Sequence, residues 1–472
     1  MRKTKIVCTL GPSIQTYEDV KDLIRSGMDV ARINMSHGDY ASYAHWIDMV
    51  KDARAELEVP VAILLDTKGP EIRIGVFEKN TVTLKDGELF VLTTKPVVGN
   101  AKYVSLTNKK LLKILKPKDK ILLNDGLVEL KVLKIEGTEI VCKIVHGGEL
   151  SNHKSLNIPG IPFAMEFLTE ADKKDLEFCA TQDIDYLALS FVNCKQDVEK
   201  IKSFLEKLNM NQVKLISKIE SAKGVKNMDE IIASSDGVMV ARGDLGVEVE
   251  FTKIPAIQKQ IIAKCNQAGK AVITATQMLE SMTQSSRPTR AEISDVANAV
   301  LDGTSAVMLS GETAKGKYPF LTCKTMAKIV QECEKDIDTT KQMANNALFQ
   351  QENLSKSMGY AAVSLSYTTQ AKAILVVTFS GKTAGFVAQF KPKVPIIAST
   401  PKYKTYHQMA LLWGVKPMLN KICENTDQLL ESARTLAKQA KLVKEKDIVV
   451  QTAGVPVGES AETNLLKVDI IS

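Results

Sequence analysis

The chain has 472 residues, of which 44% are hydrophobic and 25% are charged, as in folded proteins with about two to four domains. It has no apolar run near the ~18 residues that span a bilayer, no signal peptide ahead of its first apolar segment and no CxxC pair among its eight cysteines, so we expect a cytoplasmic protein without a membrane partner. Its net charge of +7 is spread along the chain without a basic stripe or an aromatic platform, so no nucleic-acid partner is expected.

The first part of the chain alternates short apolar runs with helical patterns. We expect strands at residues 5–10, 30–35 and 61–65, and helices at residues 17–26 and 40–57. This order predicts three consecutive strand–helix units.

Between residues 68 and 163 the pattern changes to short alternating runs separated by Asp-Gly and Glu-Gly turns, which predicts an inserted all-β domain. The alternation of strands and helices resumes after the proline-containing segment 158–162. The five strands expected there lie at residues 186–192, 213–219, 237–241, 271–275 and 305–309. Together with the first three they make eight, the number of strands in a closed (β/α)8 TIM barrel.

A third section begins near residue 340 and is typical of a small doubly wound α/β sheet. Its expected strands lie at residues 373–378, 394–398, 415–419 and 447–452. The fold class is therefore α/β in three domains. The barrel should comprise residues 1–67 and 164–340, the inserted β-barrel domain residues 68–163, and the C-terminal α/β domain residues 341–472.

Charged side chains follow several of the expected barrel strands at their carboxyl ends, where barrel enzymes carry their active sites. Glu220 and Asp244 end two successive strands, and two carboxylates at one rim suit a hard divalent cation such as Mg²⁺ or Mn²⁺. Lys218 shares a strand face with Glu220 and is suited to neutralise a transferring phosphoryl group. The alternative is a structural ion pair between Lys218 and Glu220, which the presence of Asp244 makes less favoured.

Oxygen-bearing and cationic side chains follow two other strands. Neutral oxygens with one carboxylate suit a weakly charged cation, and the set is Asn34, Ser36, Asp66 and Thr67. Taken singly, Ser36 and Thr67 are more often helix-capping residues. Arg32 and Arg73 offer forked donors for phosphate oxygens, whereas His37 alone is typical of a polar surface residue.

Two segments are similar to nucleotide-binding loops. Residues 311–318 nearly match a P-loop, but Tyr318 stands where a magnesium-binding Ser or Thr is required, so we reject this match. Residues 380–383 follow an expected strand and precede a helix, which suits phosphate binding, and a capped helix start without a ligand is the equally plain alternative.

Seven segments, in order along the whole chain, resemble the pyruvate kinase family. They are ARINMSHG at residues 31–38, LDTKGPEIR at 65–73, SKIE at 217–220, VARGDLG at 240–246, ATQMLES at 275–281, RPTRAE at 287–292 and MLSGETAK at 308–315. The resemblance implies a cytoplasmic homotetramer that transfers the phosphoryl group of phosphoenolpyruvate to ADP in the last step of glycolysis. Because the chain stops at Ser472, it resembles bacterial members without the extra C-terminal phosphohistidine-like domain.

The resemblance also assigns roles to matching positions. It implies Mg²⁺ on Glu220 and Asp244 and K⁺ on Asn34, Ser36, Asp66 and Thr67. It implies a phosphoryl-stabilising Lys218, substrate-phosphate contact by Arg32, substrate-carboxylate contacts by Gly243, Asp244 and Thr276, and proton routing by Thr276 and Ser310. The implied nucleotide contacts are Asn34, His37, Arg73, Lys154 and Asp125.

Glu71 matches the potassium-dependent members of the family, in which a Lys at this position would make the monovalent cation unnecessary. The resemblance also implies a β lid that swings on hinges near residues 68–70 and 158–162.

In the C-terminal domain one loop resembles the family's grip on a sugar-phosphate activator, and its residues are Thr378, Ser380, Gly381, Lys382 and Thr383. It implies allosteric regulation by a phosphorylated effector. The second loop, at residues 454–462, offers acids in place of a basic clamp, which puts fructose bisphosphate in doubt and leaves a monophosphorylated sugar or AMP open.

Two other functions stay open from the residues themselves. An aldolase-type lyase would use paired acids and a metal without ADP, potassium or a lid. A catalytically silent metabolite sensor would have lost one of Lys218, Glu220, Asp244 and Thr276, and all four are present.

Overall fold

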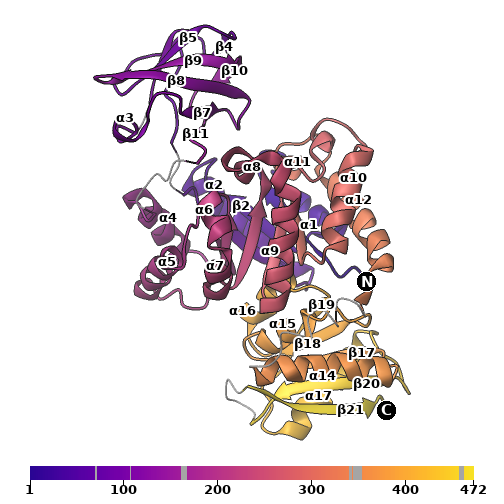
Figure 1. Cartoon of the computed structure of the whole chain (residues 1–472). Coiled ribbons are helices and arrows are strands. Elements are labelled where there is room, and N and C mark those ends of the chain that lie inside the picture. The colour runs from indigo at the N-terminus through magenta and orange to yellow at the C-terminus, as the bar shows by residue number, and fades with distance from the viewer. Residues whose placement is uncertain (70–71, 107, 161–166, 340–342, 344–352, 457–461) are drawn as a thin grey trace.

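The computed structural model describes residues 1–69, 72–106, 108–160, 167–339, 343, 353–456 and 462–472. Figure 1 shows a central barrel surrounded by helices, a β domain at one end of it and an α/β domain at the other. Among the described residues no helix is both long enough and apolar enough to cross a membrane.

The central sheet is a closed barrel of eight parallel strands, which confirms the predicted TIM barrel. The strands are β1 (Lys5–Leu10), β2 (Val30–Asn34), β3 (Ala62–Asp66), β12 (Tyr186–Leu189), β13 (Lys214–Ile219), β14 (Gly237–Ala241), β15 (Ala271–Ala275) and β16 (Ala306–Leu309). Each expected barrel strand is present, with ends that differ by a few residues at most. Three precede the inserted β domain and five follow it.

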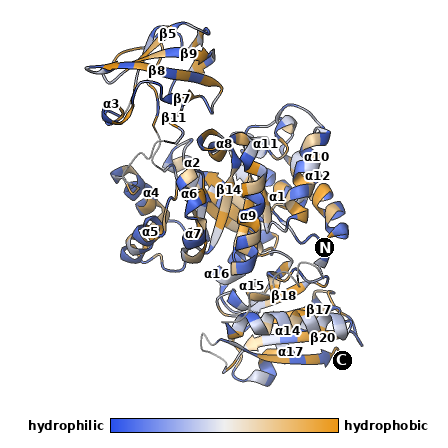
Figure 2. Cartoon of the chain, viewed as in Figure 1, coloured by the Kyte–Doolittle hydropathy of each residue, from blue (hydrophilic) through white to orange (hydrophobic). Residues whose placement is uncertain are grey.

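Helices cover the outside of the barrel. The longer ones are α1 (Tyr17–Ser26), α2 (Tyr40–Glu56), α4 (Glu170–Ala180), α5 (Lys195–Lys207), α7 (Met228–Ser234), α9 (Ile254–Ala268), α10 (Arg290–Leu301) and α12 (Pro319–Cys333). Short helices also lie in the connections, namely α6 (Ala222–Lys226), α8 (Arg242–Glu248), α11 (Gly311–Ala314), η1 (Phe251–Lys253), η2 (Glu280–Thr283) and η3 (Glu334–Asp336). Figure 2 shows hydrophobic residues concentrated on strands such as β14 and on the inner faces of the helices.

Alternate residues of each barrel strand face opposite sides, as the two-residue period of a strand requires. On β3, Leu64 packs in the barrel interior while Ile63 and Leu65 pack in the layer between strands and helices. The same alternation places Val30 and Ile216 in the interior. A side chain two residues beyond the last interior apolar residue of a strand therefore points into the mouth at the carboxyl end of the barrel.

The inserted domain has its own apolar core and two sheets. A six-stranded sheet runs in the order β11 (Leu156–Asn157), β7 (Lys120–Leu123), β8 (Val128–Glu136), β9 (Glu139–His146), β5 (Leu89–Thr93) and β6 (Tyr103–Ser105). A second sheet pairs β10 (Gly148–Ser151) with β4 (Thr81–Leu84), and one short helix, α3 (Leu111–Ile114), completes the domain. The prediction of an all-β insertion is confirmed in character, although it contains this one helical turn.

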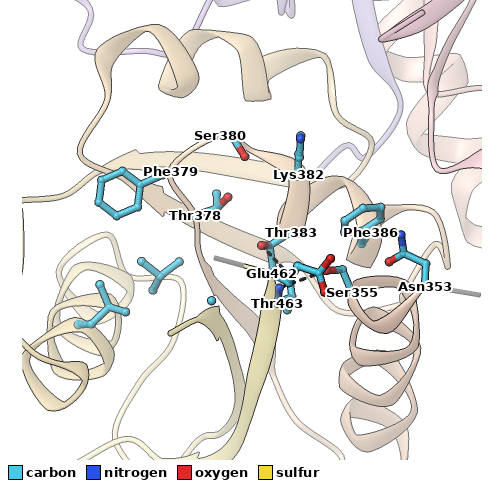
Figure 3. Close-up of a pocket in the computed structure, with 13 residues that line it drawn as sticks. Asn353, Ser355, Thr378, Phe379, Ser380, Lys382, Thr383, Phe386, Glu462 and Thr463 are labelled. Carbon is cyan, nitrogen blue, oxygen red and sulfur yellow. Dashed lines mark hydrogen bonds between the residues drawn. The ribbon is translucent and has the colours of Figure 1, made fainter. Parts of the chain in front are cut away.

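The C-terminal domain is a five-stranded sheet in the order β19 (Val415–Leu419), β18 (Ile396–Thr400), β17 (Ala373–Val377), β20 (Ile448–Gly454) and β21 (Thr463–Ile470). Its helices are α14 (Leu354–Thr368), α15 (Lys382–Ala388), α16 (Tyr403–Gln408), η4 (Met409–Leu411) and α17 (Thr426–Gln439). The edge strand β21 pairs antiparallel with β20 and was not among the expected strands. The winding direction reverses between β17 and β20, and a pocket of about 210 Å³ lies beside their carboxyl ends (Figure 3).

The C-terminal domain closes the amino end of the barrel. Ala410 and Leu411 of η4 are buried in the same apolar cluster as the barrel interior. Gln408 donates from Nε2 to the carbonyl oxygens of Gln212 at 2.7 Å and Asp185 at 3.1 Å. The active end of the barrel is therefore the opposite, carboxyl end. The predicted domain boundaries stay predictions, and the residues flanking 163/164 and 340/341 lie outside the described part of the chain.

A buried ion pair joins α2 to the start of β12, so its loss tests how the barrel is held together. The Arg54 guanidinium lies 2.9 Å from Asp185 and also donates to the carbonyl of Val61. Replacing Arg54 by Met (Arg54→Met) should lower the free energy of unfolding by about 3 kcal/mol, because it leaves the Asp185 carboxylate buried without its partner. Urea unfolding followed by circular dichroism measures this loss.

The matched control is Lys51→Met on the same helix, where the ammonium lies 4.0 Å from the exposed Asp48. We expect this change to alter stability by less than about 0.5 kcal/mol. Equal effects of the two substitutions would contradict the structural role of the buried pair.

Candidate active site

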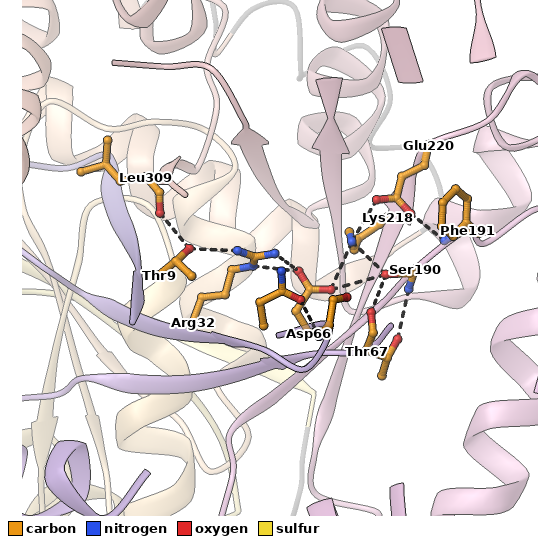
Figure 4. Close-up of polar contacts among 11 residues, drawn as sticks. Thr9, Arg32, Asp66, Thr67, Ser190, Phe191, Lys218, Glu220 and Leu309 are labelled. Atoms are coloured by element: carbon orange, nitrogen blue, oxygen red, sulfur yellow. Dashed lines mark hydrogen bonds and ion pairs between the residues drawn. The ribbon is translucent and has the colours of Figure 1, made fainter. Parts of the chain in front are cut away.

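The interior alternation of the barrel strands gathers a polar cluster at the carboxyl-end mouth (Figure 4). Beyond the apolar interior residues lie Thr9, Arg32, Asp66, Ser190, Lys218 and Glu220, which come from five different strands or the turns after them. All six side chains are buried. Side chains from distant parts of the sequence therefore meet because each strand carries one at the equivalent depth.

Lys218 is the centre of this cluster. Its Nζ lies 2.9 Å from Glu220 Oε1, 3.1 Å from Asp66 Oδ1 and 2.8 Å from Ser190 Oγ. The ammonium thus has three close partners, one through a hydrogen bond and two through ion pairs. The structure therefore brings together the predicted lysine with two predicted carboxylates.

Arg32 is held on the other side of the same aspartate. Its Nε donates to Asp66 Oδ2 at 2.8 Å, and its Nη1 donates to Thr9 Oγ1 at 2.9 Å. The Thr9 hydroxyl donates its own hydrogen bond to the carbonyl of Leu309. Asp66 thus bridges Arg32 and Lys218 and fixes both cations at the mouth.

Burial and charge act in opposite directions on this cluster. Burial raises the pKa of Glu220 to about 7, because the nearby Lys218 only partly offsets the loss of water and Asp244 adds a second negative charge. Burial also opposes the charged form of Lys218, but Asp66 and Glu220 outweigh it and raise the pKa of this lysine. For Asp66 the cost of burial is outweighed by Lys218 and Arg32, so its pKa is lowered. The mouth therefore holds a permanent ammonium and a carboxylate that lacks full compensation.

Asp244 and Gly243 begin α8, directly after β14, which is the neighbour of β13 in the barrel. The Gly243 amide donates to Thr276 Oγ1 at 2.9 Å, so α8 and the turn after β15 are in contact. Asp244 lies close enough to affect the pKa values of both Lys218 and Glu220. The structure thus places Gly243, Asp244 and Thr276 at one side of the lysine cluster.

Thr276 has a strained backbone that needs support. Its φ is +67° and that of Gln277 is +54°, in the left-handed region that β-branched residues disfavour. Arg242 supplies the support, since its guanidinium donates to the carbonyls of Ala275 at 3.1 Å and Thr276 at 2.5 Å. Asp295 on α10 holds Arg242 in turn, at 2.7 Å.

The residues predicted for a monovalent cation lie at the ends of β2 and β3. Asn34 pairs with Asp66 across these strands, and Asn34 Oδ1 accepts from the Ser36 amide at 3.1 Å. Thr67 Oγ1 accepts from the Ser190 amide at 3.3 Å. The four oxygen-bearing residues are therefore neighbours, with Asp66 shared with the lysine cluster. Glu71, on which the potassium prediction depends, lies outside the described residues.

The predicted nucleotide-binding residues divide between the barrel and the inserted domain. Partial burial and then the positive charges of Arg73, Lys315, Arg32 and Lys154 lower the pKa of His37, so these cations lie around it. Arg73 donates to the carbonyl of His153 at 2.8 Å. This group is a strongly cationic approach to the barrel mouth.

Asp125 belongs to the inserted domain. It is exposed on a turn there, and its carboxylate accepts from Ser155 Oγ at 3.2 Å. Ser155 in turn forms an antiparallel bridge with Arg73.

Ser310 follows β16, two residues beyond the interior Met308. Its amide donates to Glu312 at 2.6 Å, while its buried hydroxyl oxygen has no hydrogen-bond partner among the described residues. A buried hydroxyl without a partner is costly unless a ligand or water satisfies it. Ser310 is thus free to bond to a molecule in the mouth.

Four contributors were not predicted from the sequence, namely Thr9, Ser190, Arg242 and the amide of Phe191. The strand alternation contains a signal for two of them, because Thr9 and Ser190 lie two residues beyond the interior residues Val7 and Ala188. Arg242 binds backbone carbonyls and Phe191 acts through its backbone amide, and no residue-type pattern reveals such contacts.

A parallel barrel whose carboxyl-end mouth holds a buried ammonium, a guanidinium and two carboxylates defines a (β/α)8-barrel enzyme that acts on anionic substrates. Comparison with known proteins identifies which one. The family model for the barrel domain of pyruvate kinase matches residues 1–323, and the model for its alpha/beta domain matches residues 356–469. The chain therefore belongs to the pyruvate kinase family, and it is a phosphotransferase.

Similar proteins cover the whole chain. A pyruvate kinase of Clostridium acetobutylicum is 44% identical over 472 residues, which is all of both chains. One of Geobacillus stearothermophilus is 44% identical over all of this chain and 81% of its own length. A crystal structure of a pyruvate kinase from Cryptosporidium parvum superposes with a TM-score of 0.93 at 37% identity, covering 100% of this chain and 96% of that one. The resemblance seen in the sequence is confirmed, and the lyase and sensor alternatives are not supported.

The Arg242 clamp, meaning the hydrogen bonds of its guanidinium to the carbonyls of Ala275 and Thr276, can be tested by replacing the guanidinium with an ammonium of the same charge. Arg242→Lys should lower kcat/KM for phosphoryl transfer by about 10²-fold, because a small displacement of the Thr276 turn misaligns the bound substrate. A coupled assay of pyruvate formation measures it. Arg25→Lys, on an exposed helix far from the mouth, should leave kcat/KM within twofold of the unmodified chain, and an equally harmless Arg242→Lys would contradict the clamp.

Proposed function

We propose that the chain transfers the phosphoryl group of phosphoenolpyruvate to ADP, giving pyruvate and ATP as the last step of glycolysis in the cytoplasm. The observation that carries this proposal is the buried Lys218, held between Asp66 and Glu220 with Arg32 beside it. Both substrates are polyanions, and a phosphoryl transition state needs fixed positive charge more than covalent chemistry. The barrel mouth supplies such charge in a buried position where it is strong.

Magnesium or manganese fits Glu220 and Asp244. Among the described residues no cluster of three or more His, Cys, Asp or Glu side chains is suited to a metal, so two carboxylates would leave most of an octahedral shell to water and substrate oxygens, as Mg²⁺ prefers. Burial raises the pKa of Glu220, Lys218 offsets this only in part, and Asp244 adds to it, so a bound cation would supply the charge that is still missing. When bound, the ion would polarise the substrate oxygens and offset the charge between donor and acceptor.

Potassium fits the oxygen set formed by Asn34, Ser36, Asp66 and Thr67. These residues are neighbours at the ends of β2 and β3, and three of the four are neutral donors of oxygen. A weakly charged ion suits such a set better than a transition metal. It would lie next to the Arg32 side of the mouth, where the phosphate of the substrate is expected.

The chain's own residues then have distinct tasks. Arg32, fixed by Asp66 and Thr9, would hold the phosphate, and Lys218 would stabilise the group in transit. The substrate carboxylate would contact Gly243, Asp244 and Thr276. Thr276 and the unpaired hydroxyl of Ser310 are suited to deliver a proton to the enolate of pyruvate.

The inserted domain would act as a lid over the nucleotide. Asn34, His37, Arg73, Lys154 and Asp125 would bind this nucleotide. The domain already contacts the barrel, since Asn157 Nδ2 donates to Glu248 Oε1 of α8 at 3.2 Å. Closure would exclude water and so prevent hydrolysis of the phosphoryl group. Of the expected hinges, residues 70 and 161–162 lie outside the described part of the chain.

The pocket in the C-terminal domain supports regulation by a phosphorylated effector. It lies where the sheet reverses its winding, the usual place for ligands in α/β sheets. Figure 3 shows Thr378, Ser380, Lys382 and Thr383 around it. Gly381 has φ of +80°, which allows the loop to turn, and its amide donates a hydrogen bond to Thr378 Oγ1 at 3.0 Å.

The charge of this pocket favours one phosphate over two. Among the described residues that line it, Lys382 is the one cation and Glu462 the one acid. A second phosphate would be repelled by the Glu462 carboxylate, whereas the hydroxyls of a sugar or ribose could donate hydrogen bonds to it. We therefore favour a sugar monophosphate or AMP over fructose bisphosphate. The family membership also supports a homotetramer as the regulated form.

The catalytic proposal is tested by pyruvate formation from phosphoenolpyruvate and ADP with Mg²⁺, in K⁺ and in Na⁺. We expect turnover that requires ADP and rises with K⁺. Lys218→Met should lower kcat by about 10³-fold, because it removes the charge that stabilises the transition state. The exposed Lys200→Met is the control and should match the unmodified chain. Full activity of Lys218→Met would refute the role of this lysine, and equal activity in Na⁺ would refute the potassium site.

The effector proposal is tested with Lys382→Ala. Basal activity should be unchanged, while the concentration of ribose 5-phosphate or AMP needed for half-activation should rise at least tenfold. Lys444→Ala, an exposed lysine elsewhere in the same domain, should respond like the unmodified chain. Activation by fructose bisphosphate at lower concentration than by either monophosphate would overturn the preference for a single phosphate.

A further inference from the structure

The turn after β12 contacts both charged groups of the lysine cluster. Ser190 Oγ accepts from Lys218 Nζ at 2.8 Å and donates its proton to the carbonyl of Thr67 at 2.7 Å. Asp66 Oδ1 is the weaker alternative acceptor, at 3.5 Å. Because the single hydroxyl proton goes to Thr67, the oxygen lone pairs face the ammonium. Ser190 is only 3% exposed, so this orientation is enforced by its surroundings.

The next residue holds the carboxylate partner of the lysine. The Phe191 amide donates to Glu220 Oε2 at 2.7 Å. Phe191 has φ of +55°, a conformation that bulky residues disfavour and that persists only where surrounding contacts require it. Here the strain aims the amide at Glu220. Two consecutive residues of one turn thus fix the ammonium and its carboxylate.

The chain that leaves the barrel for the inserted domain runs directly over this turn. Gly69 has φ of +67°, and a Cβ atom placed on it would lie 2.6 Å from Ser190 Cβ and 3.2 Å from Phe191 Cδ2. No residue with a side chain fits at this distance. The exit segment, residues 67–69, is therefore packed against the turn and also hydrogen-bonded to it.

We propose that Ser190 is a positioning residue for phosphoryl transfer, which fixes the Lys218 ammonium between Asp66 and Glu220. The close packing of Gly69 on the 190–191 turn keeps Ser190 in place and links the exit segment, which leads to the inserted domain, to the lysine. Ser190 acts through Lys218, since the bonds of its hydroxyl go to this lysine and to the Thr67 carbonyl. The inference rests on the proposed phosphoryl-transfer function.

The physical reason lies in the length of the lysine side chain. An ammonium on four flexible bonds between two carboxylates can pair with either of them in several orientations. The Ser190 hydroxyl adds a directional hydrogen bond to the two less directional ion pairs, and this bond defines one orientation of the ammonium. Loss of this acceptor should affect a step that depends on the exact position of charge and have little effect on ground-state binding.

The first test compares Ser190→Ala with Ser217→Ala. Ser217 is a matched control, because it is equally buried, adjacent to Lys218 on β13, and bonded away from the mouth to Ser235 at 2.7 Å. We expect Ser190→Ala to lower kcat about tenfold to a hundredfold with KM for phosphoenolpyruvate within threefold. Ser217→Ala should keep kcat within threefold. An unchanged kcat in Ser190→Ala, or an equal loss in both variants, would overturn the proposal.

A double variant separates positioning from a general structural role. In the Lys218→Met background the further loss from Ser190→Ala should be less than twofold, because the group that Ser190 positions is gone. A tenfold further loss would show that Ser190 acts independently of the lysine and would refute the inference. Thermal unfolding midpoints of all variants confirm that each remains folded.

The contact between the exit segment and the 190–191 turn is tested by comparing Gly69→Ala with Gly137→Ala. Both glycines have positive φ, so both substitutions strain the backbone, but a Cβ on Gly137 meets nothing within 4 Å. Gly69→Ala should lower kcat at least tenfold, and Gly137→Ala should leave it within twofold. Equal effects would refute the role of the contact.

Crystal structures keep this inference separate from the proposed function. If the unmodified chain shows no turnover of phosphoenolpyruvate and ADP, the proposed function fails, yet the position of the lysine can still be compared. In Ser190→Ala the Lys218 ammonium should stay between the two carboxylates but shift toward one of them or occupy several positions. An ammonium in the same place in both crystals would overturn the positioning role whatever the activity.

Discussion

The site depends on keeping one ammonium and two carboxylates out of water. Lys218 lies in the mouth of an apolar barrel, where an isolated charge would be prohibitively costly, and Asp66 and Glu220 make its burial possible. The same carboxylates set the positions of the other groups. Asp66 fixes Arg32, while Glu220 keeps a raised pKa that reflects its incomplete compensation. The cluster is therefore stable as a unit and still able to accept further positive charge.

The architecture of the barrel explains why such a cluster forms at this end. Interior residues of all strands are apolar along most of their length, and η4 of the C-terminal domain seals the amino end with Ala410 and Leu411. Polar side chains are tolerated only beyond the last interior apolar layer, at the carboxyl ends. The strained backbones lie at the same rim, at Thr276, Gln277 and Phe191. Their unfavourable conformations are held by Arg242 and by the packing of Gly69, so the rigid barrel stabilises a strained site.

Much of the fold could be predicted, because long periodic signals define it. Every barrel strand was expected within a few residues, since buried parallel strands are continuous apolar runs. The strand β21 was not expected, because it is an antiparallel edge strand that mixes polar and apolar residues and is buried at one residue, so it lacks that signal. Lys218 and Glu220 were predicted as one face by the two-residue period. Ser190 was not, because a lone serine after a strand has many ordinary explanations.

Two kinds of cation should complete the charge cluster at the barrel mouth, and crystals of the chain with Mn²⁺, Rb⁺ and phosphoenolpyruvate but no ADP would show whether they do. Anomalous scattering should place manganese about 2.1 Å from oxygens of Glu220 and Asp244. Rubidium should lie among Asn34, Ser36, Asp66 and Thr67, and the Lys218 ammonium should contact the phosphoryl group. Manganese bound elsewhere, or a phosphoryl group without contact to Lys218, would show that this cluster is not the site of phosphoryl transfer.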